Sequence, residues 1–165
     1  MTTRKLTMMA LLVGLSILGA NIKVLGSIAL DSFPAFLGAL LLGPLAGAVI
    51  GAVGHIFSAM LAGFPFSVPV HLIVTAMMAV TMYTFAFTYA KLEKKGTMYA
   101  IIGSAMVGYL FNVILNLAGV YPFIGNVAFA LLLPLTMATF ANLFLCYVVY
   151  IRVRSFFPSV ESSSL

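Results

Sequence analysis

The chain has 165 residues, of which 64% are hydrophobic and 7% are charged, and its mean hydropathy is +1.22. A soluble domain of this size could not bury so much apolar surface, so the composition predicts a single integral membrane domain over residues 1–165. Apolar segments continue almost to the C-terminus, which argues against a signal peptide followed by a soluble protein. The single cysteine, Cys146, excludes an intramolecular disulfide and a cysteine-based metal site.

Most of the basic residues behind the formal charge of +5 lie before the first apolar segment, in one short loop, or after the last apolar segment. They are Arg4, Lys5, Lys91, Lys94, Lys95, Arg152 and Arg154. Basic residues in alternate connections follow the positive-inside pattern, which places both termini in the cytoplasm and argues against nucleic-acid binding. Only Lys23 falls on the outer side.

Hydropathy predicts an all-α membrane protein with six transmembrane helices in a compact bundle. The expected spans cover residues 6–22, 35–42, 45–62, 70–90, 98–120 and 126–151. This even number keeps the two basic ends on one side of the membrane. The second span is short and follows Pro34, so it must be tilted, joined to the preceding loop or packed within protein. We expect a loop over residues 121–125, a kink at Pro134 and a disordered tail over residues 155–165.

The segment over residues 43–71, GPLAGAVIGAVGHIFSAMLAGFPFSVPVH, carries the most information. Its three helical glycines, Gly47, Gly51 and Gly54, would let neighbouring helices approach closely. His55 and Ser58 are three residues apart and therefore share one helix face. A loop with two prolines and two phenylalanines follows and leads at once to His71. A polar helix face that opens into a rigid aromatic loop indicates a pocket.

Other polar and aromatic side chains are expected at the same outer depth, where polar groups in a membrane protein face protein or water. The predicted substrate-binding residues are Asn21, Lys23, Asp31, His55, Phe57, Ser58, Phe64, Phe66, His71, Tyr109, Asn112, Asn116, Tyr121 and Asn126. Each also has a plain structural explanation: an amide or hydroxyl can simply bond a neighbouring helix, and outer aromatic rings can form an interfacial belt. Lys23 and Asp31 can equally be an incidental charge pair in a solvated loop.

The sequence lacks the residue patterns of several reaction classes. It contains neither a phosphate-binding glycine loop nor the HExxH pattern of zinc proteases, and Asp31 has no acidic partner outside the cytoplasmic loop and the tail. We therefore expect no catalytic residue, no resident metal and no cofactor. The predicted site can bind a molecule, but nothing in the sequence would drive its transport.

The first span presents small residues at two helical spacings. Ala10 and Gly14 form one small-xxx-small pair, and Ser16 and Ala20 form another. Either pair predicts a packing face for a helix inside or outside this protein.

These features together resemble a known family. The Asp31-Ser-Phe-Pro34 segment, followed by the glycine-rich segment 43–66, is similar to the second and third spans of the substrate-binding S components of energy-coupling factor (ECF) transporters. The resemblance implies a protein of the prokaryotic plasma membrane that captures a vitamin or vitamin precursor from outside. It would then dock on a membrane coupling protein driven by two ABC ATPases, and topple in the bilayer to release the cargo inside. Ala10, Gly14, Ser16 and Ala20 would stand in for the family's docking motif, which is usually written with alanines.

The stretches Gly54-His55 to Phe64-Pro65 and Pro69-Val70-His71 look most like the branch of S components for α-ribazole, a nucleoside-like precursor of the cobalamin lower ligand. Its bicyclic ring would stack on an aromatic side chain, and its ribose would meet the asparagine and histidine side chains. Riboflavin, pantothenate and cobalamin are alternative cargoes of such a subunit. A structural subunit without a ligand, an ion-coupled carrier and a small membrane enzyme are the readings from other classes.

Overall fold

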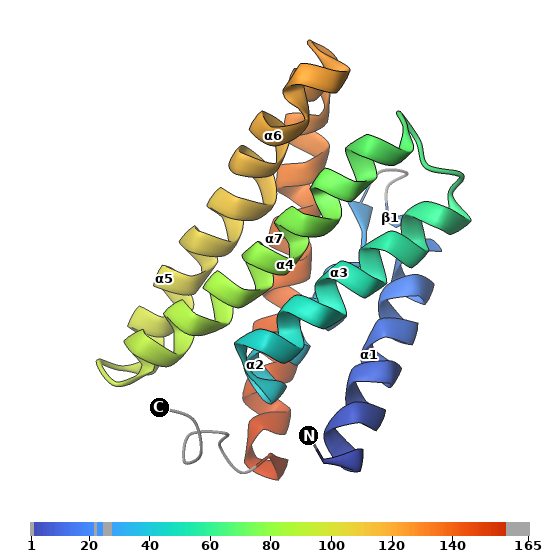
Figure 1. The fold of residues 1–165 in the computed structure, drawn as a ribbon. Coiled ribbons are helices and arrows are strands. Elements are labelled where there is room, and N and C mark those ends of the chain that lie inside the picture. Colours follow the sequence, from blue (N-terminus) through green and yellow to red (C-terminus); the bar gives the residue numbers. More distant parts are fainter. Residues whose placement is uncertain (1, 22, 25–27, 158–165) are drawn as a thin grey trace.

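The structure is a computed structural model and describes residues 2–21, 23–24 and 28–157, with side chains described outside residues 22–29. In this part of the chain the helices form a bundle of six rods (Figure 1). The rods are α1 (Thr3–Asn21), α2 (Phe33–Leu42), α3 (Pro44–Leu61), α4 (Val68–Glu93), the continuous α5–η1–α6 (Thr97–Tyr109, Leu110–Leu115 and Asn116–Ile124), and α7 (Val127–Val153). The predicted all-α, six-helix architecture is confirmed.

Five of these rods are long and apolar enough to cross a membrane, and α2 is the shorter sixth. At about 1.5 Å per residue, a ten-residue helix spans roughly half of the hydrocarbon core. Helix α2 lies inside the protein, packed against α1, α3, α4 and α7, and almost all of its residues are buried. Of the three possibilities open for the short second span, packing within protein is therefore the one the structure adopts.

The first turn of α2 is held by α7. Pro34 occupies the first turn, where its missing N–H costs nothing, and the backbone N–H of Phe33 donates to Asn142 Oδ1 at 2.6 Å. Asn142 lies well inside α7, so α2 begins at mid-depth in the bundle. The chain therefore descends between the helices before α2 starts.

The glycines of α3 allow its close packing, as predicted. A Cβ atom on Gly47 would lie 2.6 Å from the Cα of Ala39 in α2, and one on Gly51 would lie 3.2 Å from the Met78 carbonyl in α4. A Cβ on Gly54 would lie 2.9 Å from the Cβ of Ser16 in α1. Three neighbours thus approach one helix at three successive small residues.

The rod between α4 and α7 differs from the prediction at its end. The helix continues through Pro122 to Ile124, so the loop expected over residues 121–125 is wrong. Gly125 ends the helix instead, because its positive φ of 55° turns the chain while its N–H donates to the Tyr121 carbonyl at 2.8 Å. Within the same rod, residues Leu110–Leu115 form a π-helix, which hydropathy could not indicate.

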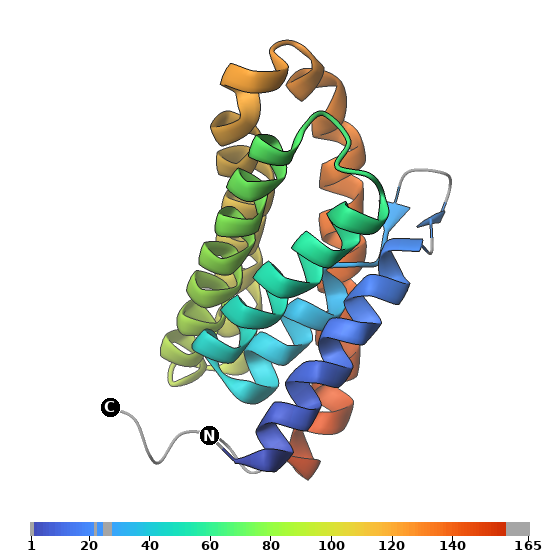
Figure 2. The same cartoon turned by 45° about the vertical axis from the view of Figure 1, so that its right-hand side comes forward.

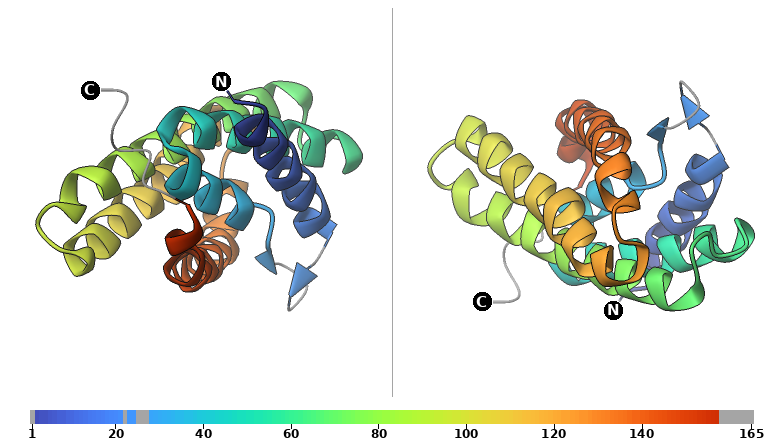
Figure 3. Two further views of the ribbon diagram at one scale, coloured as in Figure 1. Left: turned by 90° about the horizontal axis from the view of Figure 1, so that it is seen from below. Right: turned by 90° about the horizontal axis from the view of Figure 1, so that it is seen from above.

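The connections divide between two ends of the bundle. At one end lie a two-residue antiparallel hairpin, β1 (Lys23–Val24) with β2 (Ile28–Ala29), the α3–α4 loop and the α6–α7 turn; we call this the hairpin end (Figures 2 and 3). The opposite, basic end holds the start of α1, the α4–α5 turn and the end of α7 (Figure 1). The short 3-10 helix η2 (Arg154–Phe156) follows α7 there, and Arg154 lies 3.7 Å from Glu93. Most of the expected tail, residues 158–165, lies outside the described residues.

Candidate functional site

Two histidines meet at the hairpin end. His55 of α3 and His71 of α4 lie with Nε2 of His55 3.2 Å from Nδ1 of His71, and their rings stack at 5.3 Å between centroids. The other nitrogen of His71, Nε2, lies 2.8 Å from the carbonyl oxygen of Pro65, which can only accept. The edge of the Phe64 ring stands on the His71 ring at 5.8 Å. We call His55, His71, Phe64 and Pro65 the histidine cluster.

The backbone of the α3–α4 loop explains why the two rings meet. Helix α3 ends in a Schellman motif, in which Phe64 N–H donates to the Ala59 carbonyl at 2.8 Å and Gly63 N–H donates to the Met60 carbonyl at 3.1 Å. The positive φ angles of Phe64 and Phe66, 51° and 72°, are uncommon for aromatic residues and cost about 1–3 kcal/mol each. The surrounding contacts hold this strained loop over His71.

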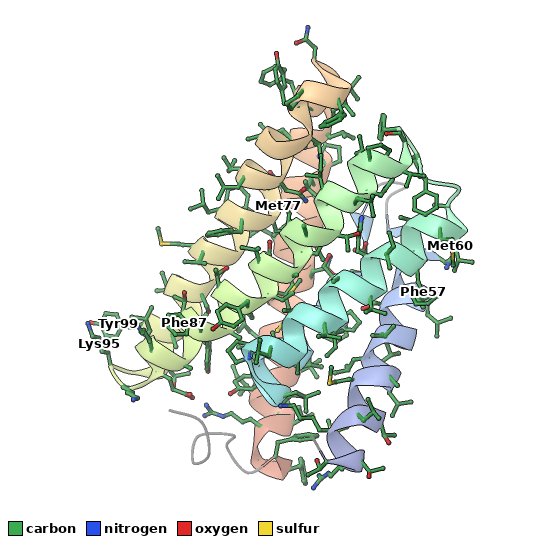
Figure 4. The ribbon with its side chains drawn as sticks, viewed as in Figure 1. Phe57, Met60, Met77, Phe87, Lys95 and Tyr99 are labelled. Atoms are coloured by element: carbon green, nitrogen blue, oxygen red, sulfur yellow. The ribbon has the colours of Figure 1, made fainter. Side chains whose placement is uncertain are left out.

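The neighbours of the histidine cluster on α3 point in different directions. Ser58, one turn beyond His55, has a buried hydroxyl without a partner among the described residues. Phe57 and Met60 lie toward the end of α3 that leads into the loop, and both are exposed (Figure 4). Phe66 is exposed as well. Of the aromatic residues predicted for the site, only Phe64 contacts the histidines.

A second polar group lies at the π-helix. Asn112, inside η1, donates from Nδ2 to Thr139 Oγ1 of α7 at 2.9 Å, and the Thr139 hydroxyl donates to the Leu135 carbonyl. Asn116 follows η1 and donates to the Asn112 carbonyl at 3.3 Å, while its own Oδ1 is buried without a partner. Tyr109 stacks on Phe140 of α7 at 5.4 Å between ring centroids. Tyr109 and Asn112 thus tie α5 and η1 to α7, and no described contact joins them to the histidine cluster.

The start of α2 carries the acidic candidate. Leu30 N–H donates to the Gly19 carbonyl at 3.2 Å, so the chain passes directly across α1 before it turns inward. Asp31 follows and accepts a hydrogen bond from the Ser32 hydroxyl at 3.2 Å. Burial raises the pKa of the Asp31 carboxyl above its ordinary value of 3.8, and the Ser32 hydrogen bond opposes this rise only in part. The Lys23 side chain lies outside the described residues, so both predictions for Lys23 and Asp31, an incidental charge pair and two ligand contacts, stay predictions.

Three further candidates lie apart from these groups. Asn21 is exposed and bonds its own helix, donating to the Ile17 carbonyl at 3.0 Å. Asn126 is exposed at the α6–α7 turn. Tyr121 stands with its ring edge against Phe129 at 5.8 Å and lines a cavity of about 430 Å³ between α6 and α7. The lining of this cavity is almost wholly apolar: Ile114, Leu117, Ala118, Tyr121, Ala128, Phe129 and Leu132.

The small residues of α1 fall on different faces. Ala10 is exposed, and a Cβ on Gly14 would meet nothing within 4 Å, so this pair is open to a partner outside the chain. Ser16 is buried against Gly54 of α3 and is used inside the protein. Ala20 is partly buried. Of the two pairs of small residues, Ala10 and Gly14 are the pair that the described part of the chain leaves uncovered.

The structure also assigns polar roles that the sequence did not single out. Thr139 links α7 to Asn112, and Asn142 caps α2. Both lie on α7 three residues apart and face the bundle, so their shared helix face was an available signal. The Pro65 carbonyl, which orients His71, could not be found in a side-chain pattern at all.

Long apolar helices, with a polar and aromatic cluster at one end, have the features of a membrane subunit that binds a small molecule. Comparison with known proteins is consistent with this class. The sequence matches the family model described as "ECF transporter, substrate-specific component" over residues 4–154. The match covers nearly the whole chain, and the chain belongs to this family.

The protein is therefore a multi-pass membrane protein and a transport subunit, not an enzyme, and it works with a substrate and the energising module of an ECF transporter. The comparison with curated proteins gave no match, and neither did the comparison with solved structures.

Proposed function

We propose that this substrate-specific component captures α-ribazole at the hairpin end, with the histidine cluster as part of the binding site. The observation that carries the proposal is the contact between His55 and His71, 3.2 Å apart on neighbouring membrane helices and anchored to the Pro65 carbonyl. Polar rings inside a membrane protein are costly, and they are kept where a function or a partner requires them.

The chemistry of the cluster suits a nucleoside-like molecule. A bicyclic aromatic ring gains about 0.5–1.5 kcal/mol from stacking on a ring such as Phe64, beyond the burial of its surface. The ribose hydroxyls need hydrogen-bond partners, which His55 and the unpaired Ser58 hydroxyl would supply. Asn112 and Asn116 remain candidates for a deeper part of the site, because the Asn116 oxygen is buried and unpaired.

The same proposal places the coupling surface on α1. Ala10 and Gly14 lie on its open face and would dock on the membrane coupling protein, whose two ABC ATPases supply the energy. We exclude Ser16 from this docking surface, because it packs against Gly54 within the chain. The hairpin end would then face outward and the basic end the cytoplasm.

The proposal is tested by thermal unfolding of the purified protein with α-ribazole, riboflavin, thiamine, biotin, pantothenate, folate or cobalamin. A ligand at 100 times its Kd stabilises the folded state by about 2.7 kcal/mol, so a true cargo raises the melting temperature clearly. We expect the largest rise with α-ribazole. No rise with any compound, for a protein shown to be folded, would favour a structural subunit instead.

The site is tested by titration of α-ribazole into the His55→Ala variant. We expect affinity to fall at least tenfold, because the variant loses both the ring and its hydrogen bond to His71. Tyr99→Ala is the matched control, since Tyr99 is an exposed aromatic residue at the basic end (Figure 4). Equal affinity of both folded variants would remove His55 from the site.

A further inference from the structure

The donor and the acceptor of each hydrogen bond in the histidine cluster can be assigned by starting from the Pro65 carbonyl. The Pro65 carbonyl only accepts, so Nε2 of His71 carries the hydrogen. In a neutral His71 ring, Nδ1 is then a bare acceptor, and the hydrogen bond at 3.2 Å must be donated by Nε2 of His55. The remaining nitrogen of His55, Nδ1, is consequently a bare acceptor. None of the described residues donates to it.

Both rings are taken as neutral because of their surroundings. For His55, which is partly buried within α3, an imidazolium without an anion close by is expensive, and His71, which is partly exposed in the first turn of α4, has no anion beside it among the described residues that would favour its charged form. No described carboxylate contacts either ring. The basic side chains that the structure describes lie at the opposite end of the bundle.

From this geometry we infer that the cargo is an uncharged molecule that donates hydrogen bonds through hydroxyl groups, and that His55 Nδ1 accepts one of them. The inference rests on the proposed binding site at the histidine cluster. It deepens that proposal by naming the recognising atom and by excluding anionic cargo. A phosphate or carboxylate would bring lone pairs to an acceptor that has no hydrogen to offer.

A second, independent observation also favours a cargo that donates hydrogen bonds. The Asn116 amide donates to the Asn112 carbonyl, which leaves Oδ1 as a buried acceptor without a partner in the described part of the chain. An unmet buried acceptor costs about 1–3 kcal/mol, and a cargo hydroxyl would remove that cost. Lys23 belongs to the hairpin end through β1, but its side chain lies outside the described residues, and the side chains described at this end include no lysine or arginine to attract an anion. Asp31 would repel one when ionised.

The tautomers can be measured without any ligand. The chain has only two histidines, so ¹⁵N-histidine labelling gives two rings, and the His55→Gln variant assigns them. At pH 7.5 we expect both rings to be neutral, with hydrogen on Nε2 and a bare Nδ1. A hydrogen on Nδ1 of His55, or an imidazolium at either position, would overturn the inference.

The cargo class is measured with matched pairs that differ by one phosphate: α-ribazole with its 5′-phosphate, and riboflavin with its 5′-phosphate. We expect the uncharged member of the pair that binds to do so at least tenfold more tightly. Replacing His55 by Phe, which keeps a flat ring and removes the acceptor, should weaken this member at least tenfold.

The outcomes separate the two proposals. A phosphorylated member that binds equally well or better overturns the inference and leaves the proposed capture role standing. Binding of uncharged riboflavin but not of α-ribazole supports the inference and overturns the proposed cargo. If neither pair binds, both fail.

Discussion

At the scale of single residues, the most informative atoms are those left without a partner. Buried polar atoms in proteins are nearly always hydrogen-bonded. Among the buried side-chain atoms in the described part of this chain, Ser16 Oγ, Ser58 Oγ and Asn116 Oδ1 are exceptions. Ser58 lies one turn from His55, and Asn116 lies next to the π-helix, where the regular hydrogen-bond pattern changes. Unpaired atoms at such positions are candidates for hydrogen bonds to a bound molecule.

Asp31 gives a prediction about pH. Its pKa is raised in the folded protein, so the folded state binds its proton more tightly than the unfolded chain. Stability from this group is therefore highest at low pH, falls as pH rises above 3.8, and stays low above the raised pKa. The Asp31→Asn variant lacks this titration. We expect its melting temperature to exceed that of the wild type at pH 8 and the difference to shrink toward pH 4.

Glu93→Gln is the control for Asp31, because Glu93 lies at the basic end beside Arg154. This variant should keep the pH-dependent loss of stability that Asp31 causes. A difference between wild type and Asp31→Asn that does not change with pH would show that the carboxyl titrates normally, for instance through a partner such as Lys23.

At the scale of helices, α3 is the element on which the packing depends. A methyl group on Gly47 would press against the backbone of Ala39, and the backbone cannot move aside as a flexible side chain could. Gly14 of α1 has open space at the same position. Gly47 therefore has no room for a larger side chain, whereas Gly14 has, although both glycines lie on helix faces rich in small residues.

The prediction for α3 compares two identical substitutions. Gly47→Ala should lower the free energy of unfolding by about 1–3 kcal/mol, because it overpacks the contact with α2. Gly14→Ala should leave it unchanged or raise it by up to about 1 kcal/mol through helix propensity. Unfolding in detergent with a chemical denaturant measures both. Equal losses in the two variants would mean that helix α1 is also packed at Gly14.

The helices were predictable from the sequence, and the site only in part. Hydropathy locates the long spans, since each needs a run of apolar residues, and the glycines of α3 indicate its contacts. The π-helix and the two-residue hairpin depend on backbone details without such a pattern. The polar residues expected at one depth predicted a single site lined by all of them. The structure instead shows separate groups, because Asn21 and Asn116 bond their own helices and Asn112 bonds α7.

At the scale of the whole molecule, most of the basic residues and the histidine cluster lie at opposite ends. Arg4 and Lys5, the three lysines near the α4–α5 turn, and Arg152 and Arg154 all belong to the basic end. The histidine cluster belongs to the hairpin end. The proposed capture from outside requires this separation, because basic loops are retained in the cytoplasm and the proposed site must then face outward.

This polarity yields a prediction about topology. Cys146 is buried within α7, so a Cys146→Ala background allows single cysteines to be placed at exposed positions. In intact cells, a membrane-impermeant maleimide should label Asn126→Cys at the hairpin end and should label Ser155→Cys at the basic end only after permeabilisation. The two positions flank the same helix, so they must react from opposite sides. Labelling of Ser155→Cys in intact cells would reverse the orientation and place the histidine cluster on the cytoplasmic side, where it could not capture cargo from outside.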